Sequence, residues 1–173
     1  MASLLLVDLR SPINFGMCLR LAETFAINVL AYDPSKMTQV AEKRGTISDF
    51  ACGALERKGF VLIDDLDAWV RPKSVRLVAS SIEASAAPLE TFSFLQSDII
   101  AVGNEYDGLA EHFVAGADAV VRISMADVWT PKPRAAQPID PTRARSVARD
   151  GSPSLNVAIS AGILCHAAYS SLR

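Results

Sequence analysis

Five short apolar runs recur along the chain, and each is bounded by polar or turn-forming residues. They are Leu4–Val7, Ile27–Ala31, Val75–Ala79, Ile99–Val102 and Ala119–Ile123. Runs of this length without polar alternation are typical of strands that are buried on both faces of a sheet. Because helical patterns separate the runs, the sequence predicts an α/β fold built on a parallel sheet that helices flank.

The helical patterns are of two kinds. After the first run, apolar side chains recur at helical spacing at Phe15, Cys18, Ala22 and Phe25. Short helices are predicted at residues 66–70 and 109–114. The last segment, Leu155–Leu172, is apolar on nearly every side, so we expect it to be buried all round, partly in its own domain and partly in a dimer contact.

Size and charge limit the possible functions. The chain has 173 residues, which suits one domain over residues 1–173. The net charge of −2 excludes a broad cationic field, so any nucleic-acid binding must come from a local basic patch or from a dimer. No apolar run is long enough to span a bilayer, and the first residues lack a basic leader, so we expect a cytoplasmic protein.

Cysteine and histidine are sparse. Cys18, Cys52 and Cys165 form no C-x-x-C pair, and His112 and His166 lack metal-ligand spacing to them. Neither a disulfide framework nor a metal site is predicted.

A proline-rich basic segment at about residues 126–151 interrupts the strand–helix alternation. Its basic residues are Lys132, Arg134, Arg143, Arg145 and Arg149. Long segments of this composition are either binding loops or disordered surface loops, and both alternatives stay open.

The polar stretch after the first apolar run opens a helix. Asn14 can cap that helix, Gly16 allows a close approach to its first turn, and Arg20 is its only cation. The alternative is an ordinary helix with a solvated pair between Arg20 and Glu23.

Two further polar stretches come later. Gly103 and Gly108 bracket the turn after Ile99–Val102, where ligands bind in open α/β sheets, and Glu105 there could complement a cationic ligand. A plain strand–turn–helix connector would use the same residues. At the start of the last helix, Ser152 or Ser154 can cap it and Pro153 suits its first turn, and Asn156 adds a further polar group.

Taken in order, these stretches resemble the three motifs of the SpoU-type RNA ribose 2′-O-methyltransferases of the SPOUT superfamily. The motifs read Asn14-x-Gly16-x-x-x-Arg20, Gly103-Asn104-Glu105-x-x-Gly108-Leu109, and Ile123-x-Met125 followed by Ser154-Leu155-Asn156-Val157. The resemblance implies a C-terminal trefoil knot, bound S-adenosyl-L-methionine, an RNA substrate and a homodimer. A sulfonium methyl donor needs neither a metal nor a covalent intermediate, in agreement with the absence of a metal-ligand pattern.

Site residues follow from the resemblance, position by position. The catalytic group implied is Arg20, Asn14, Glu105 and Asn156. The methyl-donor site implied comprises Ala79, Ser80, Ser81, Gly103, Asn104, Glu105, Gly108, Ile123, Met125, Ser154, Leu155 and Asn156. RNA contacts are expected from Arg20 and from the basic segment, through Arg143, Arg145 and Arg149.

Two departures from the family pattern concern the third motif. Residues 126–153 separate Met125 from Ser154, whereas the family joins them by a short link, and Ala158 stands where a small hydroxyl residue is frequent. Without an added RNA-binding domain, the chain resembles the small tRNA wobble-ribose methyltransferases, which favours tRNA over rRNA. The alternatives are a non-catalytic RNA-binding or assembly factor with the knotted fold and a plain nucleotide-binding α/β domain.

Overall fold

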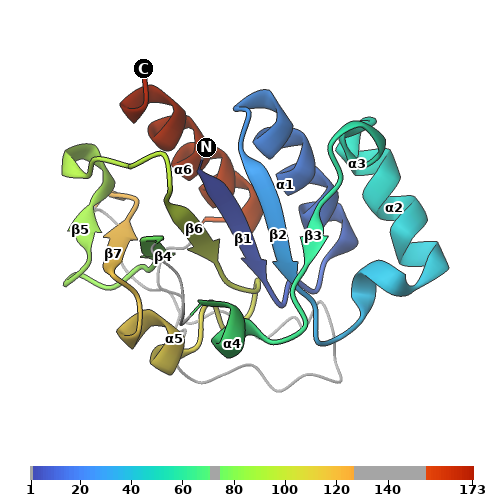
Figure 1. The fold of residues 1–173 in the computed structure, drawn as a ribbon, viewed down its shortest axis with the longest axis horizontal. Coiled ribbons are helices and arrows are strands. Elements are labelled where there is room, and N and C mark those ends of the chain that lie inside the picture. The colour runs from blue at the N-terminus through green and yellow to red at the C-terminus, as the bar shows by residue number, and fades with distance from the viewer. Residues whose placement is uncertain (1, 71–74, 127–154) are drawn as a thin grey trace.

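A parallel sheet organises the molecule. The computed structural model describes residues 2–70, 75–126 and 155–173, and in it seven strands pair in the order β3-β2-β1-β6-β4-β7-β5, all in parallel (Figure 1). The strands are β1 (Ser3–Val7), β2 (Asn28–Tyr32), β3 (Val61–Leu62), β4 (Leu77–Ser80), β5 (Ala87–Pro88), β6 (Ile99–Val102) and β7 (Ala119–Arg122). The predicted parallel α/β sheet is confirmed, and each of the five apolar runs overlaps a strand.

Helices cover both faces of the sheet. They are α1 (Pro12–Thr24), α2 (Ala41–Ala51), α3 (Ala54–Arg57), α4 (Leu66–Val70), α5 (Glu111–Ala115) and α6 (Val157–Ser171), with 3₁₀ turns η1 (Met37–Gln39) and η2 (Leu89–Thr91). Leu4 and Leu6 of β1 point into the larger core, under α1, α2 and α6. Leu5 and Val7 point to the opposite face, where Phe113 of α5 packs. The alternation in β1 thus divides the interior into two cores.

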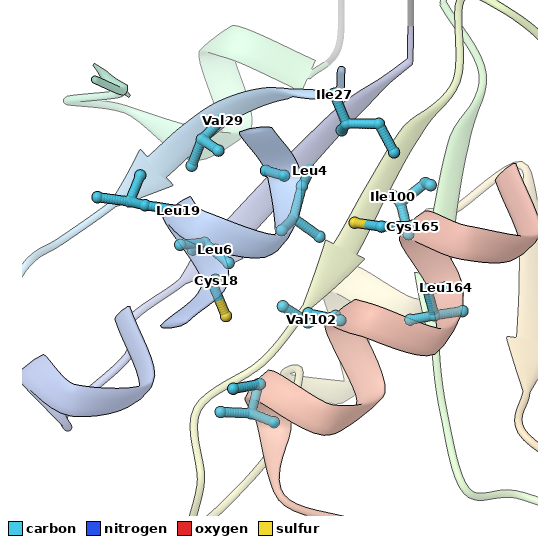
Figure 2. Packing of buried hydrophobic residues seen from close by; sticks show 14 of the residues in the cluster. Leu4, Leu6, Cys18, Leu19, Ile27, Val29, Ile100, Val102, Leu164 and Cys165 are labelled. Carbon is cyan, nitrogen blue, oxygen red and sulfur yellow. The ribbon is translucent and has the colours of Figure 1, made fainter. Parts of the chain in front are cut away.

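The larger core lies between the sheet and the paired helices α1 and α6. Figure 2 shows Cys18 of α1 and Cys165 of α6 among aliphatic side chains that cover β1 and β6. Gly16 makes the other contact of α1 possible, because a Cβ there would lie 2.5 Å from the carbonyl oxygen of Ile47 in α2. The close approach predicted for Gly16 is therefore made by a neighbouring helix.

Helix α1 begins differently from the prediction. Ser11 is its N-cap, and the Ser11 hydroxyl accepts a hydrogen bond from the backbone N–H of Asn14 at 3.3 Å. Pro12 fills the first helical position, where its missing N–H costs nothing. The predicted cap at Asn14 is wrong, because Asn14 lies inside the first turn and its side chain is engaged elsewhere.

Helix α6 has a different cap from the predicted serines, and the single chain does not test its expected burial in a dimer contact. Its N-cap is Asn156, whose Oδ1 accepts from the backbone N–H groups of Ala158 and Ile159 at 2.9 and 3.4 Å. The helix is not buried all round in the single chain, since Ile159 is 50% exposed and Ile163 is exposed on the same side. The expected caps Ser152 and Ser154 lie outside the described residues, as do Pro153 and the basic segment from residue 127 onward. The predicted knot is not tested by the described residues and stays a prediction.

Candidate active site

The site forms where neighbouring strands send the chain in opposite directions. Strands β1 and β6 pair with Leu6 opposite Val102, so the segments that follow them start side by side. From β1 the chain continues toward β2, and from β6 it continues toward β7 on the other side of the sheet. In open α/β sheets, ligands bind at such a switch point beyond the carboxyl ends of the strands.

The carboxylate of Glu105 joins the two segments. Its Oε2 accepts a hydrogen bond from the backbone N–H of Arg10 at 3.0 Å, and its Oε1 accepts one from the backbone N–H of Ser11 at 3.1 Å. Oε1 also accepts from Nδ2 of Asn14 at 2.8 Å. Three N–H donors thus converge on one carboxylate, which fixes the loop between β1 and α1.

Asn14 extends this network to the last helix. It is 8% exposed, and while its Nδ2 donates to Glu105, its Oδ1 accepts from Nδ2 of Asn156 at 3.1 Å. Asn156 in turn uses its own Oδ1 to cap α6. Glu105, Asn14 and Asn156, here called the Glu105 cluster, therefore connect all three predicted motifs by direct hydrogen bonds.

The turn from Gly103 to Gly108 presents Glu105. Asn104 closes it: its Oδ1 accepts from the backbone N–H groups of Tyr106 and Asp107, and its main chain forms a bridge with Gly108. A Cβ on Gly103 would lie 1.9 Å from the carbonyl carbon of Gly108, whose φ is +72°. Both glycines are required by the loop itself, before any contact with a ligand is considered.

The residues predicted to hold the methyl donor gather along the same sheet edge. Ala79 of β4 pairs with Ala101 of β6 and with Val120 of β7, so the ends of these three strands are adjacent. Ser80 ends β4, and the backbone N–H of Ser81 donates to the carbonyl of Val121 at 2.9 Å.

The segment after β7 continues this surface. Ile123 packs against the larger core, and Met125 is half-buried. Between them, the Ser124 hydroxyl donates to Oε2 of Glu90 at 2.8 Å. Leu155 is exposed, next to the cap of α6, and Ser154 lies outside the described part of the chain. The described residues therefore place apolar side chains and hydroxyl groups along this edge.

Arg20 stands apart from the Glu105 cluster. It is exposed on α1, and its Nη1 lies 3.4 Å from Sγ of Cys52. It lies six positions along the helix from Asn14, which corresponds to a rise of roughly 9 Å. The alternative pair with Glu23 is wrong, because Glu23 forms a two-contact ion pair with Arg57, at 2.8 and 2.7 Å.

Electrostatics rule out a thiol nucleophile in the core. Burial raises the pKa of Cys165 to about 12. Burial, with the nearby Cys165 and Glu105, also raises the pKa of Cys18 far above its usual range. Both thiols therefore stay protonated at neutral pH and behave as apolar groups.

The described residues contain neither a metal site nor a membrane-spanning helix. Over residues 2–70, 75–126 and 155–173, no group of three or more acidic, cysteine or histidine side chains is placed to hold a metal ion. Within the same ranges, no helix has the length and apolar character that crossing a membrane requires.

Two residues next to the site were not predicted from the sequence. Asp8 and Arg10 flank Leu9 directly after β1, and their side chains pair at 2.5 Å, while the backbone N–H of Arg10 donates to the Glu105 carboxylate. Their signal was a pair of opposite charges at the carboxyl end of the first predicted strand. The predicted RNA contacts Arg143, Arg145 and Arg149 lie outside the described residues.

Comparison with known proteins gives both a family and a fold. The model of the SpoU rRNA Methylase family matches residues 1–130. No curated protein matches the chain in sequence.

Solved structures resemble nearly the whole chain. One, described as "Structural insights into the 2-OH methylation of C/U34 on tRNA", is 23% identical with a TM-score of 0.74 and covers 99% of this chain and 96% of its own. An AdoMet-bound rRNA methyltransferase from Sinorhizobium meliloti is 20% identical with a TM-score of 0.72, over 99% of this chain and 57% of its own. A TrmH/SpoU tRNA modifying enzyme from A. aeolicus is 15% identical with a TM-score of 0.73, over 98% and 74%. The chain thus has the fold of these enzymes.

Proposed function

The chain belongs to the SpoU rRNA methylase family, and we propose that it transfers a methyl group from S-adenosyl-L-methionine to a ribose 2′-hydroxyl of RNA. The observation that carries this proposal is the Glu105 cluster. Its three side chains come from the three motifs and are hydrogen-bonded at the switch point of the sheet. Open α/β sheets bind their ligands at such a switch point, and the cluster places polar side chains there.

A tRNA is the proposed substrate, and rRNA is the alternative. The structure described for methylation of C/U34 on tRNA is matched over 96% of its length, whereas the rRNA methyltransferase from Sinorhizobium meliloti is matched over 57%. A tRNA substrate places the proposed activity in the cytoplasm.

The methyl donor is proposed to lie along the ends of β4, β6 and β7. Ile123, Met125 and Leu155 would cover its apolar parts, and Ser80 and Ser81 would bind its polar groups, with Ser154 completing the site. When bound, the donor supplies a methyl group on a positively charged sulfur, which is already activated for displacement, and it leaves as S-adenosyl-L-homocysteine. What the protein must add is alignment of the two reactants.

The Glu105 cluster supplies this alignment as a positioning device. Since both carboxylate oxygens of Glu105 already accept hydrogen bonds, from Arg10, Ser11 and Asn14, the carboxylate is engaged in holding the loop. We therefore assign it a positioning role rather than that of a base for the 2′-hydroxyl. Asn156 sets the start of α6 against the same loop.

Arg20 is proposed to bind the RNA phosphate next to the target ribose and to stabilise the charge that develops on the attacking oxygen. A guanidinium keeps its proton in proteins, so the hydroxyl proton leaves to that phosphate or to water. Arg20 lies roughly 9 Å along α1 from Asn14, so it would act together with the Glu105 cluster of a second subunit or through RNA that spans the distance. The basic residues Arg143, Arg145 and Arg149 are proposed as further phosphate contacts.

A homodimer is proposed from the exposed apolar stripe of α6. Ile159 and Ile163 lie four residues apart on α6, and both are exposed in the single chain. A helix with an apolar exposed face is normally covered by another surface. A second copy of α6 is the occupant that fits, since the stripe is self-complementary.

Two measurements test the proposed function. Mass-spectrometric analysis of nucleosides in tRNA and rRNA, from cells with and without the protein, should show the loss of one 2′-O-methylated nucleoside from tRNA. Loss of a methylated nucleoside from rRNA instead would identify rRNA as the substrate. Purified protein should also move labelled methyl from S-adenosyl-L-methionine to the unmodified tRNA, and RNA binding without transfer would support the assembly-factor alternative.

A ligand panel addresses the remaining alternative. A thermal-shift comparison of S-adenosyl-L-methionine with ATP and NAD should show stabilisation by the first alone. Equal stabilisation by all three would favour a general nucleotide-binding domain.

A further inference from the structure

Asp8 is in an unusual state at the carboxyl end of β1. Its backbone has a φ of +52°, a left-handed conformation that non-glycine residues rarely adopt. Its Oδ1 is buried and has no hydrogen-bond partner among the described residues, while its Oδ2 lies 2.5 Å from Nη2 of Arg10. Aspartate tolerates this conformation, so the unsatisfied buried oxygen is the feature that calls for an explanation.

Arg10 is fixed at its backbone and available at its tip. Its N–H donates to Oε2 of Glu105 at 3.0 Å, which ties its main chain to the Glu105 cluster. Its side chain is 37% exposed, and Asp8 is the only hydrogen-bond partner of its guanidinium in the part of the chain that the structure describes. A guanidinium has five N–H donors, so most of its binding capacity is available to a ligand.

The Arg76–Asp98 pair shows how this chain builds an ion pair for stability. Both carboxylate oxygens of Asp98 contact Arg76, at 2.9 and 2.7 Å, and Asp98 is fully buried. The backbone N–H of Leu95 also donates to Asp98. Asp8 and Arg10 have one contact and one unsatisfied oxygen, so their arrangement contributes little to stability and leaves Arg10 able to exchange partners.

We propose that Arg10 binds a phosphate of the RNA backbone at the active site, and that Asp8 holds its guanidinium in place until RNA displaces it. The inference rests on the proposed function, because it names one contact that the RNA substrate makes. A net charge of −2 gives the chain no general attraction for RNA, so an individual cation at the site must carry part of the affinity. The phosphate would take the place of Asp8 on the planar guanidinium, where two parallel hydrogen bonds are possible.

The carboxylate of Asp8 has an opposing effect on the bound state. It repels the incoming phosphate, so Asp8 lowers RNA affinity while it orders Arg10. Replacing Asp8 should therefore raise RNA affinity, whereas replacing Arg10 should lower it. In a merely structural ion pair, the loss of either partner would change RNA affinity in the same direction.

The experiment measures tRNA binding over a series of salt concentrations for wild type, Arg10→Gln, Arg10→Lys, Asp8→Asn and Arg44→Gln. Arg44 is an exposed arginine on α2, so its replacement is a matched control for net charge. Asparagine tolerates left-handed backbone, so Asp8→Asn should fold normally. Calorimetry of S-adenosyl-L-methionine is run on each variant.

Arg10→Gln should weaken tRNA binding by about tenfold and reduce the salt slope by about 0.7 to 0.9, the value for one phosphate contact. Arg10→Lys should retain most of the slope, and Asp8→Asn should bind tRNA about twofold to fivefold more tightly. Donor affinity should stay at the wild-type value throughout.

Several results would overturn the inference. They are an unchanged slope in Arg10→Gln, an equal loss in Arg44→Gln, weaker tRNA binding in Asp8→Asn, or reduced affinity for S-adenosyl-L-methionine in Arg10→Gln, which would assign Arg10 to the donor carboxylate. If wild type methylates tRNA and Arg10→Gln binds it normally, only this inference fails. If wild type neither binds nor methylates RNA, the proposed function fails with it.

Discussion

Nδ2 of Asn156 donates a hydrogen bond to Oδ1 of Asn14 at 3.1 Å, across 142 positions of sequence. The same Asn156 caps α6 with its other side-chain atom. One amide therefore ties the start of the last helix to the first turn of α1, and through Asn14 to Glu105. Any change at this amide affects both helix stability and site geometry, and the two effects can be separated by the choice of substitution.

Asn156→Asp should retain the cap of α6, because the carboxylate still accepts from the N–H groups of Ala158 and Ile159. The substitution removes the donor to Asn14 and places two acceptor oxygens next to each other. Methyl transfer should therefore fall by about tenfold or more, as expected for the loss of a hydrogen bond to a buried group. Asn156→Ala should lose the activity and in addition about 1 kcal/mol of stability. Urea unfolding and methyl-transfer assays give the two readouts, and an active Asn156→Asp variant would remove the link to Asn14 from the mechanism.

Glu105→Gln should destabilise the protein, although the side chain keeps its shape. The carboxylate accepts from three N–H groups, and an amide nitrogen in the place of one oxygen would face a donor. We expect a loss of about 1 to 3 kcal/mol in unfolding free energy, with weaker binding of S-adenosyl-L-methionine by calorimetry. Glu83→Gln, at an exposed position, is the matched control. Wild-type stability in Glu105→Gln would contradict a positioning role for the carboxylate.

Arg20→Lys should lose most methyl-transfer activity while affinity for S-adenosyl-L-methionine stays near wild type. A lysine keeps the charge but cannot form two parallel hydrogen bonds with a phosphate. Single-turnover assays with saturating tRNA separate this effect from weaker RNA binding. A fully active lysine variant would exclude Arg20 from the chemistry.

The double variant Ile159→Asp, Ile163→Asp should be monomeric. Both side chains are exposed in the single chain, so the fold should tolerate the change, while a dimer would have to bury four added charges. Light scattering after size-exclusion chromatography measures the molar mass. Ser170→Asp, an exposed position on the same helix, is the control. A double variant with the mass of wild type would place any dimer contact elsewhere.

Acid should destabilise the segment after β2 through Asp33. Burial raises the pKa of this carboxyl, but hydrogen bonds from Thr38, Ser35 and the backbone of Met37 outweigh it and hold the pKa below its usual value. The contribution of a lowered pKa to stability is present above about pH 4 and is lost as pH falls through the folded-state value.

Asp33→Asn should consequently be less stable than wild type at pH 7, by about 1 kcal/mol. The difference should shrink as pH falls below 4, because the wild-type carboxyl is then protonated as well. Urea unfolding at several pH values measures this. A difference that does not depend on pH would assign the effect to packing rather than to the charge.

The buried parts of the fold could be predicted from sequence, and the exposed parts could not. The five long runs are strands with residues covered on both faces, so their composition carries the signal. In contrast, β3 and β5 have two residues each, and Val61 of β3 is 61% exposed. Helix α2 buries only Ile47 and Ala51, so it has no apolar stripe that would reveal it.

For the site, the residues could be predicted from sequence, but the contacts among them could not. Its members Asn14, Glu105 and Asn156 follow from motif order, but the hydrogen bonds among them depend on how distant segments meet, and local patterns do not encode that. The cap of α6 shows the limit, because serine and asparagine are equally good caps and only the structure selects Asn156. Asp8 and Arg10 carry opposite charges after the first strand, but a charged pair at a strand end is common and does not by itself indicate a site.

The two edges of the sheet are each closed by a strand of two residues, β3 on one side and β5 on the other. Such short edges offer too few unpaired backbone groups to recruit an extra strand from another molecule, and Pro88 removes a donor from one of them. The chain is thereby protected against edge-to-edge aggregation, even though its central strands are rich in leucine, isoleucine and valine. Any specific assembly with another macromolecule is directed to helices and loops.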